Sequence, residues 1–203
     1  VVSWKRGLWQ SALRKFKKSS DDGQQLAAEV IFLAEEILHQ GITLGAVVYE
    51  LEGSGYALHS VLSGGPLRSV LRPIHPGRKL SNGRHYNVRA QAWDCWKKAL
   101  QEGASIPNDP ALIHLGSALK YEWRESGGKK LLLLEDKKAF KKRMSADPTN
   151  PMGGPSPDEA DNCALGHLPV ELADFGLTDY LRAAGRVGED ETEEAGSWGW
   201  VAA

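Results

Sequence analysis

Apolar residues along the chain follow two patterns, one at helical spacing and one in short unbroken runs, which together are typical of a mixed α/β protein. A stripe at helical spacing predicts a first helix that ends at Gly41. The continuous apolar run over 42–51 predicts a strand buried on both faces. A strand of that kind lies in the middle of a sheet, so we expect this segment to be the central strand.

Shorter patterns predict the other elements. Segments 1–5 and 12–17 are expected to form a hairpin joined through Gly7, and Ser20, Asp21 and Asp22 are expected to cap the first helix. Further helices are predicted over 56–62, 87–102, 108–119, 137–144 and from Ser156 onward, and further strands over 67–74 and 130–135. The irregular segments 75–85 and 145–155 are predicted to be surface loops.

The length of 203 residues and the 41% hydrophobic content allow one domain with its own core but not two large ones. We therefore expect a single domain over 1–185 and a tail over 186–203. No stretch approaches the roughly 20 apolar residues of a membrane span, and Val1 begins no signal-peptide pattern, so the chain is expected to be soluble, intracellular and cut from a longer polypeptide. Cys95 and Cys163 have no metal-site spacing and are expected to be ordinary thiols.

The formal net charge of -1 divides unevenly along the chain. The tail 186–203 holds one basic and five acidic residues, which leaves 24 basic against 21 acidic residues over 1–185. Because the tail is acidic and lacks apolar periodicity, we expect it to be disordered. The cations of the body gather at 14–18 and 129–143, where they would form a phosphate-facing surface or, equally well, the solvated faces of a strand and a helix.

Glu50 stands near the end of the predicted central strand and precedes a turn that contains Gly53 and Gly55. Ligands of open α/β sheets usually bind at this end of the strands, so Glu50 is a candidate site residue. The alternative is an edge carboxylate that caps the next helix or pairs with a lysine. The two glycines lack the third glycine of a dinucleotide-binding fingerprint, which gives little support for a nucleotide cofactor.

Two more carboxylates mark the predicted start of the last helix, in the run Ser156-Pro157-Asp158-Glu159-Ala160-Asp161. Ser156 as N-cap, Pro157 at the first helical position and Glu159 in a capping box explain a helix start by themselves. They do not explain Asp161, which lies one turn after Asp158 on the same face. Two carboxylates this close repel each other unless a cation lies between them, and Mg²⁺ takes oxygen ligands of this kind.

Four motifs, in this order, resemble those of the nuclease domain of phage terminase large subunits. The Glu50 turn with Gly53 and Gly55 is similar to the family's acidic glycine turn, and Tyr86-Asn87-Val88-Arg89-Ala90 with Trp93 resembles its asparagine-arginine-alanine helix. Glu135-Asp136-Lys137 with Lys142-Arg143 resembles its short charged helix, and the run 156–161 followed by Ala164-Leu165 resembles the motif that ends the domain. The similarity spans about Val1 to Leu165.

The resemblance implies an α/β fold of the RNase H-like type, a mixed sheet flanked by helices. Acids on its first strand, central strand and last helix together bind two Mg²⁺ or Mn²⁺ ions. By this match Glu50 is the central acid and Asp158 the helical acid, with Asp161 as a further metal ligand, while Glu52 competes for the role of Glu50. The first strand and its acid have no counterpart because the similarity begins after them, so the chain alone is expected to be inactive.

The function that the resemblance implies is metal-dependent cleavage of concatemeric double-stranded DNA while a phage genome is packaged into its procapsid, in the cytoplasm of the infected bacterium. Lys137, Lys142, Arg143 and Arg89 would contact the DNA backbone. The implied partners are the portal, the small terminase subunit and an upstream ATPase domain of the same polypeptide. The chain itself has no Walker A pattern and is not expected to hydrolyse ATP.

Two alternative functions follow from the same residues. One is another RNase H-like nuclease, such as a resolvase or transposase core, against which the motif from Asn87 to Trp93 argues. The other is a packaging module that contacts DNA without cutting it, which the missing first acid favours.

Overall fold

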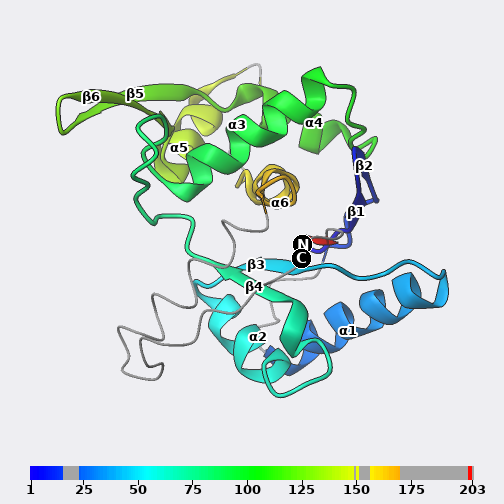
Figure 1. Cartoon of the computed structure of the whole chain (residues 1–203). Helices are drawn as coiled ribbons and strands as arrows, with labels where there is room; N and C mark the ends of the chain where they lie inside the picture. The colour runs from blue at the N-terminus through cyan, green and yellow to red at the C-terminus, as the bar shows by residue number, and fades with distance from the viewer. Residues whose placement is uncertain (16–22, 149, 151–155, 170–200, 203) are drawn as a thin grey trace.

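A computed structural model describes residues 1–15, 23–148, 150, 156–169 and 201–202. Over these residues the chain is a mixed α/β protein whose helices cover both faces of a central parallel strand pair (Figure 1). In this described part, no helix is both long and apolar enough to cross a membrane. The predicted mixture of helices and strands is therefore confirmed.

The helices lie close to their predicted places. They are α1 (Gly23–His39), α2 (Ser54–Leu62), α3 (Val88–Gln101), α4 (Pro110–Ala118), α5 (Lys137–Ala146) and α6 (Asp158–Leu165), and a 3-10 turn, η1, covers Arg68–Val70. The strands are β1 (Lys5–Arg6), β2 (Trp9–Gln10), β3 (Val47–Glu50), β4 (Leu71–Ile74), β5 (Tyr121–Ser126), β6 (Lys129–Leu134) and β7 (Val201–Ala202). The predicted cap of α1, residues 20–22, lies outside the described residues.

The central sheet has the strand order β4-β3-β7, and both pairings are parallel. β3 is shorter than the predicted strand 42–51, because it pairs with β4 only from Val47, opposite Leu71, to Glu50, opposite Ile74. The other edge of β3 pairs with β7 at Val47 and Val48. An exposed strand edge offers free N–H and C=O groups, and β7 satisfies part of this edge. Residues 201–202 of the predicted tail thus pair with β3, while 186–200 lies outside the described residues.

Two hydrophobic cores contain the side chains of β3, one on each face of the sheet. Successive side chains of a strand point to opposite faces. Val47 and Tyr49 accordingly pack in the core formed with α1 and α2, whereas Val48 packs in the core formed with α3, α4 and α6. Glu50 follows Val48 by two residues and therefore ends the strand on the α6 side, where its register partner Ile74 also packs.

β1 and β2 form the hairpin predicted at the start of the chain, joined at Gly7, whose φ is 57°. The second strand begins at Trp9 rather than at residue 12. Hydrogen bonds between buried polar side chains connect this hairpin to α6. The Ser3 hydroxyl donates to Asn162 Oδ1 at 2.8 Å, and Gln10 Nε2 donates to Ser3 Oγ at 3.1 Å. The hairpin thereby fixes the position of α6.

His167 follows α6, and its pKa is lowered from 6.5 to about 4 by burial and by the nearby charge of Lys5. The folded protein therefore holds this imidazole neutral. Its contribution to stability is complete above pH 6.5 and is lost as the pH falls from 6.5 towards 4. We expect the free energy of unfolding to decrease by about 1–3 kcal/mol over this interval, measured by urea unfolding at several pH values. His167→Gln should remove this part of the decrease, and an unchanged slope would contradict the assignment.

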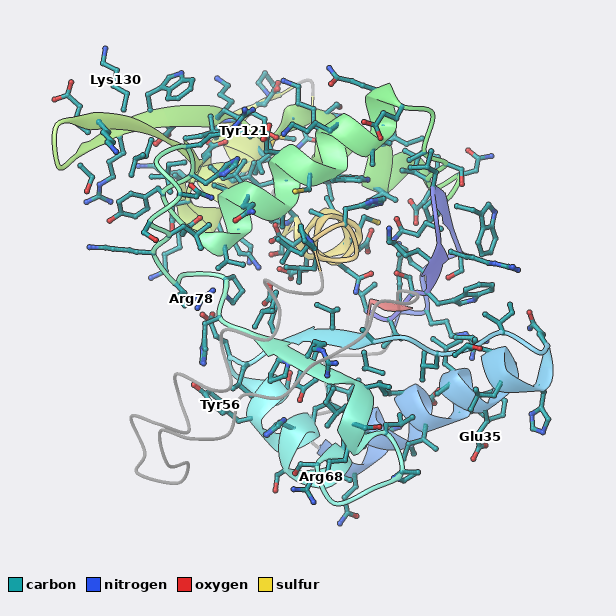
Figure 2. All side chains as sticks on the ribbon, viewed as in Figure 1. Glu35, Tyr56, Arg68, Arg78, Tyr121 and Lys130 are labelled. Carbon is teal, nitrogen blue, oxygen red and sulfur yellow. The ribbon has the colours of Figure 1, made fainter. Side chains whose placement is uncertain are left out.

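β5 and β6 form an antiparallel hairpin, in register from Tyr121 opposite Leu134 to Ser126 opposite Lys129, that extends away from the helices (Figure 1). The sequence predicted β6 but missed β5, because every residue of β5 after Tyr121 is exposed and neither face shows apolar alternation. Lys130 lies at the outer part of the hairpin, and Tyr121 lies near its base (Figure 2).

The segment 75–85, predicted to be a surface loop, ends in a buried residue instead. His85 is only 5% exposed, and its Nε2 lies 3.0 Å from Asp94 Oδ2 on α3. The backbone on either side joins β6, since Leu132 N donates to the Arg84 carbonyl and Tyr86 N donates to the Leu132 carbonyl, both at 2.8 Å. The segment 77–84 is a largely exposed loop, as predicted, but the burial of His85 could not be predicted because its surroundings come from α3 and β6.

Candidate functional site

Glu50 is the last residue of β3, at the carboxyl end of the parallel pair β3–β4, and is partly buried. Among the described residues its carboxylate has no hydrogen-bond partner. Burial raises the pKa of Glu50; the Lys137 ammonium opposes this rise, and the carboxylates of Asp161, Glu52 and Asp158 add to it. Glu50 therefore belongs to one electrostatic cluster with the acids of α6, more than 100 residues away in sequence.

The turn after β3 sets the end of this strand by close backbone packing. A Cβ added at Gly55 would lie 1.8 Å from the carbonyl oxygen of Glu50, so α2 can approach the strand end only with glycine there. Gly53 has a φ of 54°, which also favours glycine. The two glycines of the predicted turn thus position Glu50.

α6 begins at Asp158, with Pro157 in the N-cap position and no side-chain cap. The predicted capping box is wrong because both of its side chains are engaged elsewhere. Ser156 hydrogen-bonds to the Asp158 carboxylate, and Glu159 pairs with Lys15 at 2.9 Å. Lys15 also lies 2.7 Å from Asp109, the N-cap of α4. In the described part of the cation cluster 14–18, Lys15 therefore ties α6 to α4, while 16–18 lies outside the described residues.

Lys137, the first residue of α5, supplies the cation expected between Asp158 and Asp161. Its Nζ lies 3.0 Å from Asp158 Oδ1 and 2.9 Å from Asp161 Oδ2. Burial lowers the pKa of Lys137, but the charges of Asp161, Glu50 and Asp158 outweigh burial and raise it above its ordinary value. Burial raises the pKa of Asp158, whereas Ser156 and Lys137 lower it and prevail. Lys137 and Asp158 are therefore both charged at neutral pH.

Arg89 and Trp93, one turn apart on α3, hold Asp161 from the other side. Arg89 Nε donates to Asp161 Oδ1 at 2.9 Å, and Trp93 Nε1 donates to the same oxygen at 2.7 Å. Arg89 Nη1 also donates to the carbonyl of Glu135 at 3.1 Å. Asp161 is only 3% exposed, so these donors fix its orientation. The Arg89 side chain is 12% exposed and faces this acid rather than the solvent.

The charged motif 135–137 and the basic residues that follow it divide into distinct roles. Asp136 caps α5 by accepting from Lys138 N at 2.8 Å, and this cap places Lys137 at the start of the helix. Glu135 is buried and accepts from Arg143 Nε at 2.9 Å and Nη2 at 2.6 Å. Lys142 is exposed. Of the two basic residues predicted to contact DNA here, Arg143 forms an internal ion pair and Lys142 faces solvent.

Arg143→Ala is expected to lower the free energy of unfolding by about 2–4 kcal/mol, because it leaves the buried Glu135 carboxylate without its partner. It also removes the donor to the carbonyl of Ala118, the last residue of α4. Lys142→Ala is the matched control, for which we expect a change of less than about 0.5 kcal/mol. Urea unfolding of both variants measures this difference. Equal stabilities would show that the Arg143–Glu135 pair contributes nothing.

The carboxylates of Glu50, Asp158 and Asp161 are donors of the type that Mg²⁺ and Mn²⁺ prefer. Asp158 and Asp161 already converge on one cation, the Lys137 ammonium. Among the described residues, no three acidic, histidine or cysteine side chains lie close enough together to hold a metal ion. The oxygen donors of this cluster are of the type that binds Mg²⁺ or Mn²⁺. Asp158 and Asp161 would hold the metal, and Glu50 lies farther away.

Sequence reasoning missed the partners of Asp161. Arg89 was predicted to contact DNA, whereas Trp93 was considered only as part of the resemblance. Their spacing of four residues, which puts both side chains on one helical face, was the available signal. The spacing alone does not predict that this face of α3 packs against α6. Cys95 and Cys163 are not joined in a disulfide.

Comparison of the chain with models of protein families, with curated proteins and with solved structures finds no match.

Proposed function

We propose that this chain is the nuclease part of a phage terminase large subunit, a metal-dependent endonuclease of the RNase H-like type that cuts concatemeric double-stranded DNA during genome packaging. Its cofactor is Mg²⁺ or Mn²⁺. Its partners are DNA, the portal, the small terminase subunit and an ATPase domain upstream in the same polypeptide. It acts in the cytoplasm of the infected bacterium.

The pairing of Asp158 and Asp161 with Lys137, with Glu50 coupled to them electrostatically, carries this proposal. Residues from four separate motifs, on β3, α3, α5 and α6, are linked to one another. Lys137 pairs with Asp158 and Asp161, Arg89 pairs with Asp161, and the charge of Lys137 acts on Glu50 at the end of β3. A chance resemblance of short motifs gives no reason for these side chains to gather. Glu50 is only partly buried, but burial raises its pKa, and carboxylates perturbed in this way are typical of functional sites.

Each residue of the cluster has a task in phosphodiester hydrolysis. When bound, Mg²⁺ or Mn²⁺ activates the attacking water and stabilises the leaving oxygen. Asp161 is oriented by Arg89 and Trp93 and presents its Oδ2 to the cation position. Asp158 is half exposed and lies on the solvent side, where DNA approaches. Glu50 lies at the strand end, where the close packing of Gly55 fixes its backbone.

Contacts to the DNA backbone come from the exposed side of α5 in this proposal. Lys142 and its neighbour Lys141 face solvent on the helix that carries Lys137. Ammonium groups in this position neutralise phosphates without reading sequence. Arg89 and Arg143, which are held in internal ion pairs, act by positioning Asp161 and Glu135 instead.

A second candidate is a packaging module that binds DNA without cutting it. Lys137 favours it, since its ammonium already neutralises Asp158 and Asp161. The deciding experiment uses a polypeptide that extends the chain upstream, incubated with supercoiled plasmid and Mg²⁺ or Mn²⁺. The nuclease proposal expects nicked and linear products that vanish with EDTA. Binding to the plasmid without any metal-dependent nicking would support the second candidate.

The same polypeptide distinguishes a terminase nuclease from a resolvase core. We expect linear duplex and four-way junction DNA of equal length to be cut at similar rates. Cleavage confined to the junction would instead identify a resolvase.

A further inference from the structure

We infer that Lys137 is an exchangeable counter-ion: its ammonium and a divalent metal bind the same pair of carboxylates in turn, and metal binding releases Lys137 towards a DNA phosphate. This inference rests on the proposed function in taking Asp158 and Asp161 as metal ligands. In this role, Lys137 makes its positive charge available to DNA only after a metal ion has bound.

The available oxygen atoms make the two cations exclude each other. Oδ1 of Asp161 already accepts from Arg89 and Trp93. Oδ2 is buried and has Lys137 Nζ at 2.9 Å as its cation. Lys137 Nζ also lies 3.0 Å from Asp158 Oδ1. A metal held by both carboxylates needs Asp161 Oδ2, the oxygen that Lys137 now occupies, so it binds only when Nζ leaves.

Lys137 is free to leave in a way that the other partners of Asp161 are not. Its side chain is 35% exposed, whereas Arg89 is 12% exposed and Trp93 is 4% exposed. The Asp136 cap fixes the backbone at the start of α5, so the flexible four-carbon stem can move while the helix stays in place. The displaced ammonium therefore remains beside the site.

The exchange couples metal binding to DNA binding. While Lys137 pairs with Asp158 and Asp161, these carboxylates neutralise its charge, and the ammonium does not contact DNA. Once a metal neutralises Asp158 and Asp161, the same ammonium adds to the cations of Lys141 and Lys142 on the exposed side of α5. Each additional cation at a phosphate strengthens DNA binding. We therefore expect DNA to bind more tightly in the presence of metal.

Terbium luminescence tests the exchange directly on the full chain. Tb³⁺ is a hard cation that takes oxygen ligands, and Trp93, hydrogen-bonded to Asp161, lies close enough to sensitise its emission. Lys137→Met removes the competing ammonium and should tighten Tb³⁺ binding on the order of tenfold, with Mn²⁺ displacing the signal. Lys141→Met is the matched control, because Lys141 also acts on Asp158 electrostatically without lying between the carboxylates. We expect its effect to stay below about threefold.

Two results would overturn the inference. One is Tb³⁺ binding that Lys137→Met leaves unchanged, weakens or shifts no more than Lys141→Met does. The other is a wild-type affinity for a short DNA duplex that does not rise when Ca²⁺ is added. If Lys137→Met does not fold, Lys137→Gln serves in the first measurement, and the Ca²⁺ comparison uses only the wild-type chain. Because neither measurement involves cleavage, the exchange stands or falls separately from nuclease activity.

Discussion

Asp158→Asn and Glu50→Gln are each expected to abolish metal-dependent nicking of plasmid DNA by the upstream-extended polypeptide. Each change removes a charged oxygen ligand and keeps the shape of the side chain. A metal site contributes several kcal/mol of transition-state stabilisation, so we expect rates to fall at least about a hundredfold. Gel analysis of supercoiled, nicked and linear plasmid measures the rates. A variant that nicks like the parent would identify its residue as structural.

Folding controls make this result interpretable. Burial raises the pKa of Glu50, so the folded state is destabilised when Glu50 ionises, and Glu50→Gln should leave stability unchanged or increase it. Asp158 is half exposed, so the loss of its pair with Lys137 should cost less than about 1 kcal/mol. Glu52→Gln is the matched control for Glu50, since Glu52 is exposed in the turn that follows. If Glu52→Gln abolishes nicking and Glu50→Gln does not, Glu52 is the central acid.

Gly55→Ala is expected to destabilise the chain by about 3 kcal/mol or more, a large effect for one added methyl group. The new Cβ would lie 1.8 Å from the carbonyl oxygen of Glu50 and 2.9 Å from its carbonyl carbon. Both are backbone atoms at the end of β3, so no side chain can move aside to make room. Thermal and urea unfolding measure the effect.

Gly64→Ala is the control for this substitution. Gly64 follows α2, and its added Cβ would lie 3.9 Å from the nearest atom, the carbonyl oxygen of Val61. We expect it to change the free energy of unfolding by less than about 0.5 kcal/mol. If Gly55→Ala is as stable as Gly64→Ala, α2 does not pack against the strand end as closely as the structure indicates.

Most helices could be predicted from the sequence because their signals are local. The stripe of α1, the Asn87 cap of α3 and the Asp109 cap of α4 each lie within a few residues of the element that they define. β5 and β7 could not be predicted, since an exposed hairpin strand and a two-residue edge strand carry no apolar pattern. The burial of His85 was also hidden, because Asp94 and Leu132 provide its environment from other elements.

The sequence likewise predicted some features of the candidate site and not others. The spacing of Asp158 and Asp161 required a cation on one helical face, and Lys137 supplies it. The identity of that cation was beyond the sequence, since it depends on how α5 meets α6. Ser156 and Glu159 were misassigned because a capping box is a local rule, and contacts with Asp158 and Lys15 replace it. The metal, the DNA substrate and the packaging partners remain predictions.

The alternation of β3 between two cores limits how the length of the chain can change. Val47 and Tyr49 face one core, and Val48 and Glu50 lie on the other side. Inserting one residue within β3, between Val47 and Val48, would turn every later side chain of the strand to the opposite face. Glu50 would then point away from α6, and Val48 would enter the wrong core. Natural or engineered variation in length should therefore be tolerated in the loop 40–46 before the strand and not within β3 itself.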